Sequence, residues 1–261
     1  MSDAPAQPIT GLRPGEVPEH VFVCGDPARV ARIAAGWSGV REVCNVREYR
    51  VLVGEYRGVR LAAASTGIGA PSTAILVEEL ANVGARTFLR VGNSGGLAPD
   101  LALGDLVITT GAVRDDGTSR SYVDASFPAI AHHRLVAALE TAARAHGVRH
   151  RVGVTWSIDA FFARNAVLGP QGTIEPMAFG GFRPAGLARL LEDYRAAGVL
   201  NIEMESGVLL TLATLYGLRA GCICVISDRA PWPGPAELDI DKNMGACIQV
   251  ALDAMLAVAS G

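Results

Sequence analysis

The sequence predicts an α/β fold in which helices cover a mixed β-sheet. Residues 21–30 combine an apolar run rich in β-forming side chains, a glycine turn and the start of a helix, and residues 59–83 repeat this order. The chain has 261 residues, of which 50% are hydrophobic, so it can bury a sizeable core. Neither an internal repeat nor a linker is visible, and one domain spanning residues 1–261 is therefore expected.

Hydrophobic periodicity and glycine or proline punctuation assign the elements in chain order. In the first part we expect a strand at 21–24, a helix at 27–35, a hairpin of 50–54 with 59–64, a helix at 73–83, and a strand at 87–91 that enters a glycine turn at 92–96. In the second part we expect strands at 106–110, 152–155 and 219–226, helices at 129–145, 187–197, 206–216 and 241–259, and a rigid loop at 231–235. Residues 163–184 read as a long loop, which predicts a flap over a site.

Composition and charge exclude several kinds of protein. The net charge of −3 offers no basic surface for a nucleic acid. Residues 207–226 are apolar but contain Gly217 and Arg219, so a buried helix followed by a buried strand explains them better than a membrane span. The five cysteines are odd in number and lie mostly in apolar runs, which favours reduced core side chains. The N-terminus lacks the pattern of a signal peptide, and a cytoplasmic protein is expected.

The segment after the first strand has the features of an anion site. Gly25 allows close approach of a ligand to the backbone, Pro27 suits a first helical position, and Arg29 lies in the opening turn of the helix. A helix N-terminus and a guanidinium both favour phosphate. Ordinary turn chemistry is the alternative explanation of Gly25-Asp26-Pro27.

Two further strands carry charged residues near their ends. Arg90 lies inside the apolar run 88–91, and Asp228 with Arg229 follows the run 219–226. A buried arginine is costly unless it is paired, so Arg90 predicts either a bound anion or an internal salt bridge with a glutamate. Ligands of open α/β sheets bind beyond the carboxyl ends of strands, where these residues and Arg29 are expected to meet.

Glu203, Met204 and Glu205 form a second unusual group, just before an apolar helix. In an extended segment Glu203 and Glu205 point the same way. Carboxylates are good acceptors for the vicinal hydroxyls of a sugar, and Met204 could lie on its apolar face. The alternative is a helix N-terminus that uses Glu205 or Ser206 as its cap.

Together these motifs make the chain resemble the uridine phosphorylases and, more distantly, the hexameric purine nucleoside phosphorylases of bacteria. The resemblance covers nearly the whole chain in order, and its strongest segments are GDPARV at 25–30, STGIGAPS at 65–72, VEEL at 77–80, RTFLRVG at 86–92 and EMES at 203–206. It implies a three-layer α/β/α domain around a central mixed, partly barrel-like sheet. It also implies a pentosyltransferase reaction, in which a nucleoside and phosphate give a free base and ribose 1-phosphate.

The resemblance assigns roles residue by residue. Phosphate is expected to contact Gly25, Arg29, Arg90 and Asn93, together with Arg47 contributed across a dimer interface. Ribose is expected to contact Glu203, Met204 and Glu205, and the base Phe161 (or Phe162), Asn165 and Arg229, with Asp228 and Arg229 as the catalytic pair.

The same resemblance implies partners rather than a cofactor. Phosphate is the co-substrate, no cofactor is required, and the protein is expected to form a homo-oligomer, a hexamer built as a trimer of dimers. Glu48, Ile68 and Ser72 match positions that bind a potassium ion between subunits.

Departures from the uridine phosphorylase pattern lie at the base and at the 5′ end. The glutamine and arginine that read uracil are replaced by Asn165 and Val167, whereas Asp228 resembles the aspartate that protonates a departing purine. The histidine that reaches a neighbour's 5′-hydroxyl has no match, with Gln7 or Thr10 nearest. A purine or 5′-modified nucleoside is thus an alternative substrate, and a nucleosidase or a non-catalytic nucleoside-binding protein is an alternative function.

Overall fold

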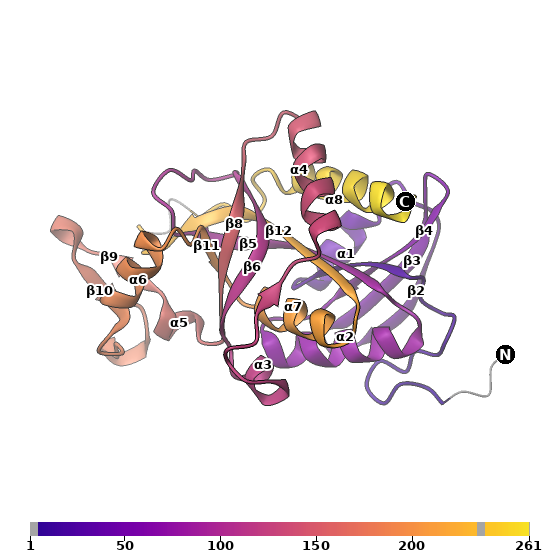
Figure 1. Cartoon of the computed structure of the whole chain (residues 1–261), viewed down its shortest axis with the longest axis horizontal. Coiled ribbons are helices and arrows are strands. Elements are labelled where there is room, and N and C mark those ends of the chain that lie inside the picture. Colours follow the sequence, from indigo (N-terminus) through magenta and orange to yellow (C-terminus); the bar gives the residue numbers. More distant parts are fainter. Residues whose placement is uncertain (1–4, 234–237, 261) are drawn as a thin grey trace.

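A mixed β-sheet runs through the molecule and closes on itself at one end (Figure 1). The computed structural model describes residues 5–233 and 238–260. The open part of the sheet contains β2 (Ser38–Val46), β3 (Tyr49–Tyr56), β4 (Val59–Ser65) and β1 (His20–Cys24), in that order. The closed part contains β5 (Thr87–Gly96), β12 (Arg219–Arg229), β6 (Leu106–Asp115), β8 (His150–Ile158) and β11 (Asn201–Glu203). Because β11 pairs with both β8 and β5, these strands form a ring, which confirms the predicted partly barrel-like sheet.

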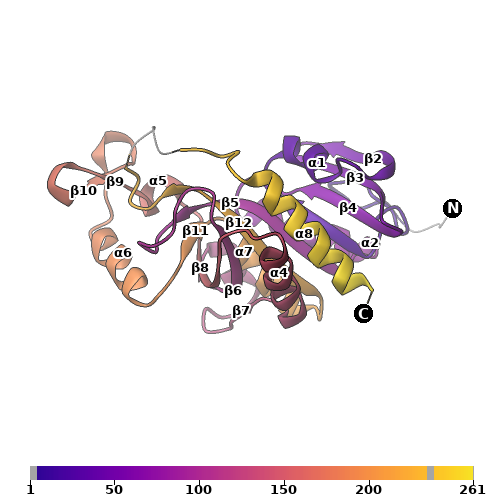
Figure 2. The same ribbon diagram turned by 90° about the horizontal axis from the view of Figure 1, so that it is seen from above.

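Helices cover the sheet on two sides, as the three-layer prediction requires (Figures 1 and 2). One layer contains α1 (Pro27–Ile33), α4 (His133–Ala145) and α8 (Met244–Ala259), and the other contains α2 (Ala70–Val83), α3 (Gly117–Tyr122) and α7 (Ser206–Leu215). Strand β1 shows how one apolar run serves both layers. Val21 and Val23 belong to the core beneath α2 and α7, whereas Phe22 and Cys24 belong to the core beneath α1, α4 and α8. Side chains alternate between the faces of a strand, so a strand covered on both faces must be apolar throughout.

A smaller unit projects from the closed end of the sheet, at the left of Figure 1. It contains α5 (Phe161–Arg164), β9 (Ala166–Leu168), η1 (Pro170–Gly172), β10 (Ile174–Pro176), η2 (Phe179–Gly181) and α6 (Leu187–Ala196). Strands β9 and β10 form a short antiparallel hairpin. The segment predicted as a long loop is therefore a hairpin with short helical turns, whose elements are too brief to show a hydrophobic period.

Strand β5 differs most from its prediction, because it continues to Gly96 where a glycine turn was expected. The glycines are not turn residues here; they are needed because a larger residue would come too close to neighbouring side chains. A Cβ on Gly92 would lie 2.8 Å from Nη2 of Arg90, and one on Gly95 would lie 3.1 Å from Oδ1 of Asp228.

Other differences concern element ends. The predicted helix at 129–145 begins at His133, since Ala129–Ile130 form β7 beside β6. Strand β2 was not predicted, because it is a mostly exposed edge strand without alternating apolar residues. Part of the loop predicted at 231–235 lies outside the described residues.

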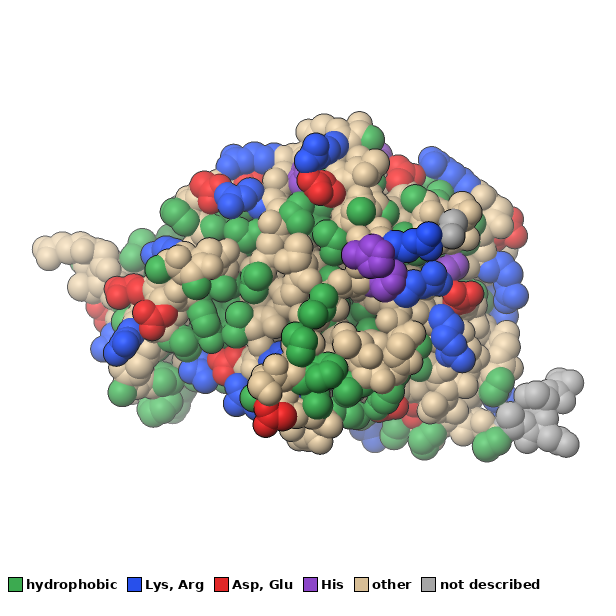
Figure 3. Space-filling view, viewed as in Figure 1, with side chains coloured by type: hydrophobic (Ala, Val, Ile, Leu, Met, Phe, Trp, Pro, Cys, Tyr) green, Lys and Arg blue, Asp and Glu red, His purple; other side chains and the backbone are tan. Residues whose placement is uncertain are grey.

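Surface and core agree with the predictions from composition. All five cysteines are free and buried. Acidic and basic side chains are interspersed over the face in Figure 3. Within the described part of the chain, no helix has the length and apolar character needed to cross a membrane. Residues 207–226 fall in α7 and β12, as expected for a buried helix followed by a buried strand.

Candidate active site

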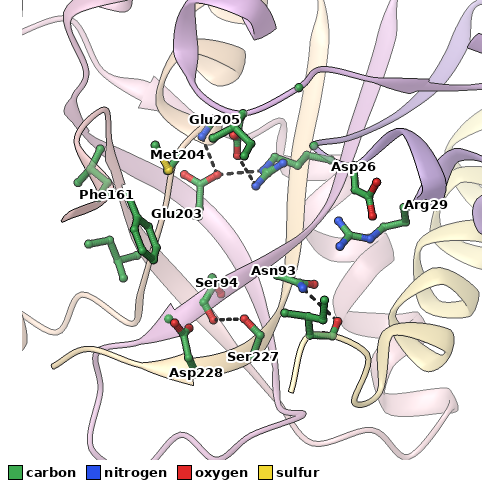
Figure 4. Close-up of a pocket in the computed structure, with 18 of the residues that line it drawn as sticks. Asp26, Arg29, Asn93, Ser94, Phe161, Glu203, Met204, Glu205, Ser227 and Asp228 are labelled. Carbon is green, nitrogen blue, oxygen red and sulfur yellow. Dashed lines mark hydrogen bonds and ion pairs between the residues drawn. The ribbon is translucent and has the colours of Figure 1, made fainter. Parts of the chain in front are cut away.

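A cavity of about 760 Å³ lies beyond the carboxyl ends of β4, β1, β5 and β12 (Figure 4). These strands are parallel neighbours in the sheet, so their ends meet at one edge. The lining residues lie in or follow these strands, or come from α1, the β2–β3 turn, the end of β8, β11, α5 and the segment after residue 237. Figure 4 places Asp26 and Arg29 at one side of the cavity and Phe161 with Met204 at the other.

The side nearest α1 is suited to an anion. Gly25 approaches the loop after β4 so closely that a Cβ would lie 3.3 Å from the carbonyl oxygen of Gly67. Asp26 caps α1 by accepting from the N–H of Ala28 at 2.8 Å. Arg29 is 9% exposed, and its Nε is buried with no hydrogen-bond partner among the described residues. A buried guanidinium with an unsatisfied donor at the cavity wall favours binding of an oxyanion.

Arg90 is shared by two carboxylates at the centre of the cavity. Its Nε lies 2.9 Å from Oε2 of Glu203, and its Nη2 lies 2.5 Å from Oε2 of Glu205. The predicted salt bridge of Arg90 with a glutamate is therefore seen, and its buried Nη1 has no hydrogen-bond partner among the described residues. Burial opposes the charge of Arg90, but the Glu205 and Glu203 carboxylates raise its pKa above the usual value.

Glu203 also fixes the start of α7. It accepts hydrogen bonds from the backbone N–H groups of Glu205 and Ser206, and from the Ser206 hydroxyl at 2.5 Å. Glu205 occupies the N-cap position of α7, as one alternative predicted, but its side chain makes no capping hydrogen bond, and the Glu203 carboxylate accepts from these N–H groups instead. Glu203 and Glu205 point the same way, as predicted, since both pair with Arg90. They do so through a turn and not through an extended strand, because β11 ends at Glu203.

Glu205 is the less satisfied of the two carboxylates. It accepts from the N–H of Gly69 at 2.6 Å and pairs with Arg90, whereas Glu203 accepts from several donors. Burial raises the pKa of Glu205 even though Arg90 favours its charged form. Two carboxylates around one guanidinium leave a net negative site, which suits positive charge that develops on a nearby ligand.

The opposite side of the cavity is mainly apolar. Phe161 and Met204 lie there, and the cavity lining also includes the apolar residues Ile158, Ile202, Leu238 and Ile240. Asn165 is 5% exposed, and its Oδ1 is buried without a hydrogen-bond partner in the part of the chain that the structure describes. The structure thus offers a planar ligand apolar contacts and a free acceptor.

Asp228 lines the cavity, and no arginine or lysine of residues 5–233 and 238–260, which the structure describes, forms an ion pair with it. Burial raises its pKa to about 6, against a smaller opposing effect of a hydrogen bond with Ser227. A carboxyl group with this pKa can donate a proton or a hydrogen bond near neutral pH.

Two predicted residues do not join the others. Arg229 turns away from the cavity, and its guanidinium donates to the carbonyl oxygens of Leu101 at 3.0 Å and Pro99 at 3.2 Å. It holds the loop after β5 in place instead of meeting a base. Arg47 is exposed in the turn between β2 and β3 with a φ of 56°, outside the cavity lining.

The residues expected to hold potassium lie close together. The Ser72 hydroxyl is 3.3 Å from the carbonyl oxygen of Ile68, and a Cβ on Gly67 would meet both Glu48 and Ser72. Ile68 and Ser72 thus lie within hydrogen-bond distance of each other, and Glu48 and Ile68 also line the cavity.

Several lining residues escaped the sequence reasoning, namely Asp26, Pro27, Gly67, Ser94, Gly95, Ile158, Ile202, Ser227, Leu238 and Ile240. The glycine-punctuated run at 65–72 was a usable signal for Gly67. For Leu238 and Ile240 no pattern exists, because they reach the cavity only through the tertiary course of the chain. The contact between β5 and this segment is an example, since Nδ2 of Asn93 donates to the carbonyl oxygen of Ile240 at 3.0 Å.

Fold and site describe an α/β protein whose cavity is suited to an oxyanion and carries two carboxylates. Residues 19–260 match the model of the Phosphorylase superfamily, and the chain belongs to this family. The uridine phosphorylase of Thermococcus kodakarensis is 44% identical over 82% of this chain and 74% of its own length. That of Escherichia coli is 36% identical over 89% of both.

Two further comparisons cover almost the whole chain. A guanosine phosphorylase of Halorubrum lacusprofundi is 34% identical over 97% of this chain and 99% of its own. The crystal structure of uridine phosphorylase from Vibrio fischeri superposes with a TM-score of 0.82 and 30% identity over 98% of both chains. The predicted family and fold are thereby confirmed.

Asp228 should make stability fall as the pH rises. Its pKa is raised from 3.8 to about 6 in the folded protein. The folded state therefore holds the proton more tightly, and stability is lost between these two values and stays lost above them. The free energy of unfolding of Asp228→Asn should exceed that of the wild type by on the order of 2–3 kcal/mol near pH 7.5, whereas near pH 4 the two proteins should have similar stability. Urea unfolding at both pH values tests this, and equal stability near pH 7.5 would contradict the raised pKa.

Gly92→Ala should weaken anion binding. The added Cβ would lie 2.8 Å from Nη2 of Arg90, which two glutamates hold in place, so the guanidinium must shift. We expect the Kd for phosphate, measured by calorimetry, to rise about tenfold or more, because a displacement of about 1 Å in a positioned group is costly. Gly186→Ala, which meets no neighbour within 4 Å, is the control. Unchanged phosphate affinity in Gly92→Ala would show that Arg90 does not bind the anion.

Proposed function

We propose that this protein is a nucleoside phosphorylase of the uridine phosphorylase type, a pentosyltransferase that cleaves the N-glycosidic bond with phosphate. The products are a free base and ribose or deoxyribose 1-phosphate. The observation that carries the proposal is the pair of buried arginines, Arg29 and Arg90, that bring unsatisfied donors to one cavity. The carboxylates of Glu203 and Glu205 and an apolar base side complete that cavity.

Phosphate occupies the side of the cavity bounded by Gly25, Arg29, Arg90 and Asn93. The arginines orient the anion and neutralise its charge, so that one oxygen faces the anomeric carbon. Cleavage builds oxocarbenium character on the sugar, and the anion on one face and Glu205 nearby stabilise that charge. The chemistry requires no cofactor beyond the phosphate co-substrate.

The ribose lies against Met204, with its hydroxyls donating to Glu205. Glu203 is already occupied by Arg90 and the start of α7, so it positions Glu205 and Arg90 rather than acting as the main sugar acceptor. Departure of the base is assisted at the far side. The neutral carboxyl of Asp228 donates to the base, and Oδ1 of Asn165 accepts one of its N–H groups.

The oligomer completes the site. Arg47 projects from an exposed turn and serves the phosphate of a neighbouring subunit in a homo-oligomer, a hexamer built as a trimer of dimers. Glu48, Ile68 and Ser72 hold a potassium ion between subunits, where it would tie the loop after β4 to its neighbour. The buried, reduced thiols support a place in the cytoplasm.

A purine nucleoside is the second candidate substrate. Asp228 has a pKa near neutrality at the base side, and the guanosine phosphorylase of Halorubrum lacusprofundi matches almost the entire chain. The uracil-reading glutamine and arginine of uridine phosphorylases are also missing at Asn165 and Val167. Phosphate-dependent release of base from uridine, thymidine, inosine, guanosine and 5′-modified analogues would separate the two candidates.

Removing either buried arginine should abolish efficient turnover. We expect Arg29→Gln and Arg90→Gln to lower kcat/KM by at least about 10²-fold, the scale for one preorganised charge-stabilising donor. Arg32→Gln is the control, since Arg32 pairs with Asp241 at the surface. Free ribose formed equally well without phosphate would instead indicate a nucleosidase, and binding without turnover would indicate a nucleoside-binding protein.

Mixed oligomers test whether Arg47 acts across subunits. Arg47→Gln and Arg29→Gln subunits should each be poorly active alone. In a mixed dimer one site combines an intact Arg29 with an intact Arg47 from its neighbour, so activity should rise well above both parents after subunit exchange. If Arg47 served its own subunit, no mixed site would be intact and activity would stay at the parental level.

A further inference from the structure

Helix α5 brings two residues to the base side of the cavity and turns a third toward the sheet. Phe161 and Asn165 line the cavity, whereas Arg164, between them, points to the last residue of β6. The Arg164 Nε lies 3.1 Å from Oδ2 of Asp115, and its Nη2 donates to Oδ1 at 3.3 Å. The contact is therefore bidentate, and such a contact orients a guanidinium as well as binding it.

Few other interactions hold α5 in place. Between residues 161–186 and the rest of the described chain, Asp115–Arg164 is the single ion pair, and the remaining hydrogen bonds are backbone ones to Trp232 and at the segment ends. A helix of four residues has no stability of its own in water. The position of α5 therefore depends on its side-chain contacts.

Asp115 is a fixed anchor for this contact. Its side chain is 14% exposed, and it also accepts from Nε1 of the buried Trp156 at 3.3 Å and lies 3.5 Å from Nη2 of Arg120. Asp115 pairs in register with Ile158, itself a lining residue at the base side. Asp115 thus lies beside the part of the cavity wall that Ile158 forms.

We propose that the Asp115–Arg164 pair is a positioning pair that fixes Phe161 and Asn165 against the base, and so sets affinity for the base without affecting phosphate. The inference rests on the proposed function. Arg164 does not touch the substrate but acts through its two neighbours. Because Arg29 lies at the opposite side of the cavity in Figure 4, the effect is confined to one half of the substrate.

The reverse reaction separates the two halves, since free base and ribose 1-phosphate are then distinct substrates. With the base that the wild type uses best, Arg164→Gln should raise the KM for the base about fivefold, the scale of a partly exposed ion pair. The KM for ribose 1-phosphate should stay within experimental error. Arg164→Lys keeps the charge but loses the bidentate contact, so its KM for the base should lie between those of the wild type and Arg164→Gln.

Two control variants distinguish positioning from general destabilisation. Arg120→Gln removes the other arginine near Asp115 but no contact to α5, and Arg189→Gln removes an exposed pair with Asp193 on α6. Both should leave the two KM values unchanged. Asp115→Asn should repeat the effect of Arg164→Gln, and it serves in its place if Arg164→Gln does not fold.

The outcomes are distinguishable. A wild-type protein without phosphorolysis of any nucleoside overturns the proposed function and, with it, the role of this pair. An active wild type whose Arg164→Gln and Asp115→Asn variants keep the same KM for the base overturns the positioning role alone. Equal increases in both KM values would also overturn it, because they would reveal a loss of overall structure. Calorimetric binding of the free base should weaken by the same factor as the KM.

Discussion

Arg90 and the two glutamates that share it determine most of the site. A guanidinium buried in a strand is tolerable only with counter-charges, and Glu203 at the end of the adjacent strand β11 and Glu205 just after it supply them. Glu203 in turn fixes the start of α7, and Glu205 binds the loop after β4. One ionic cluster therefore joins β5, β11, α7 and the β4–α2 loop. Removing Arg90 would leave two buried carboxylates without their counter-charge.

The cluster also explains why glycines occupy the end of β5. Small residues here leave space for the guanidinium of Arg90, which belongs to β5 itself, and for the carboxyl of Asp228, which approaches from the neighbouring strand β12. The sequence pattern was interpreted as a turn because glycine is most often a turn residue. In this strand the missing Cβ matters more than conformational freedom, a distinction that only side chains distant in sequence can reveal.

Local patterns predicted the elements with strong periodicity, and with them the cavity edge. The apolar run of β1, the glycine after it and Arg29 placed one wall, and Arg90 with Asp228 placed another. Predictions were weakest where the role of a residue depended on which way its side chain points in the folded protein. Arg229 adjoins Asp228 yet turns to the loop at 99–101, because alternate residues of a strand face opposite ways. Glu205 takes the N-cap position of α7 as predicted, but its side chain turns to Arg90 and Gly69, and Glu203 accepts the capping hydrogen bonds instead.

The closure of the sheet into a ring ties folding to ligand binding. Strand β11 is only three residues long, and it seals the ring by pairing with β8 on one side and β5 on the other. Its last residue is Glu203, so the strand that closes the barrel also carries a counter-charge of Arg90. An anion that strengthens the order around Arg90 would also hold this seam shut, which couples the substrate to the integrity of the barrel itself.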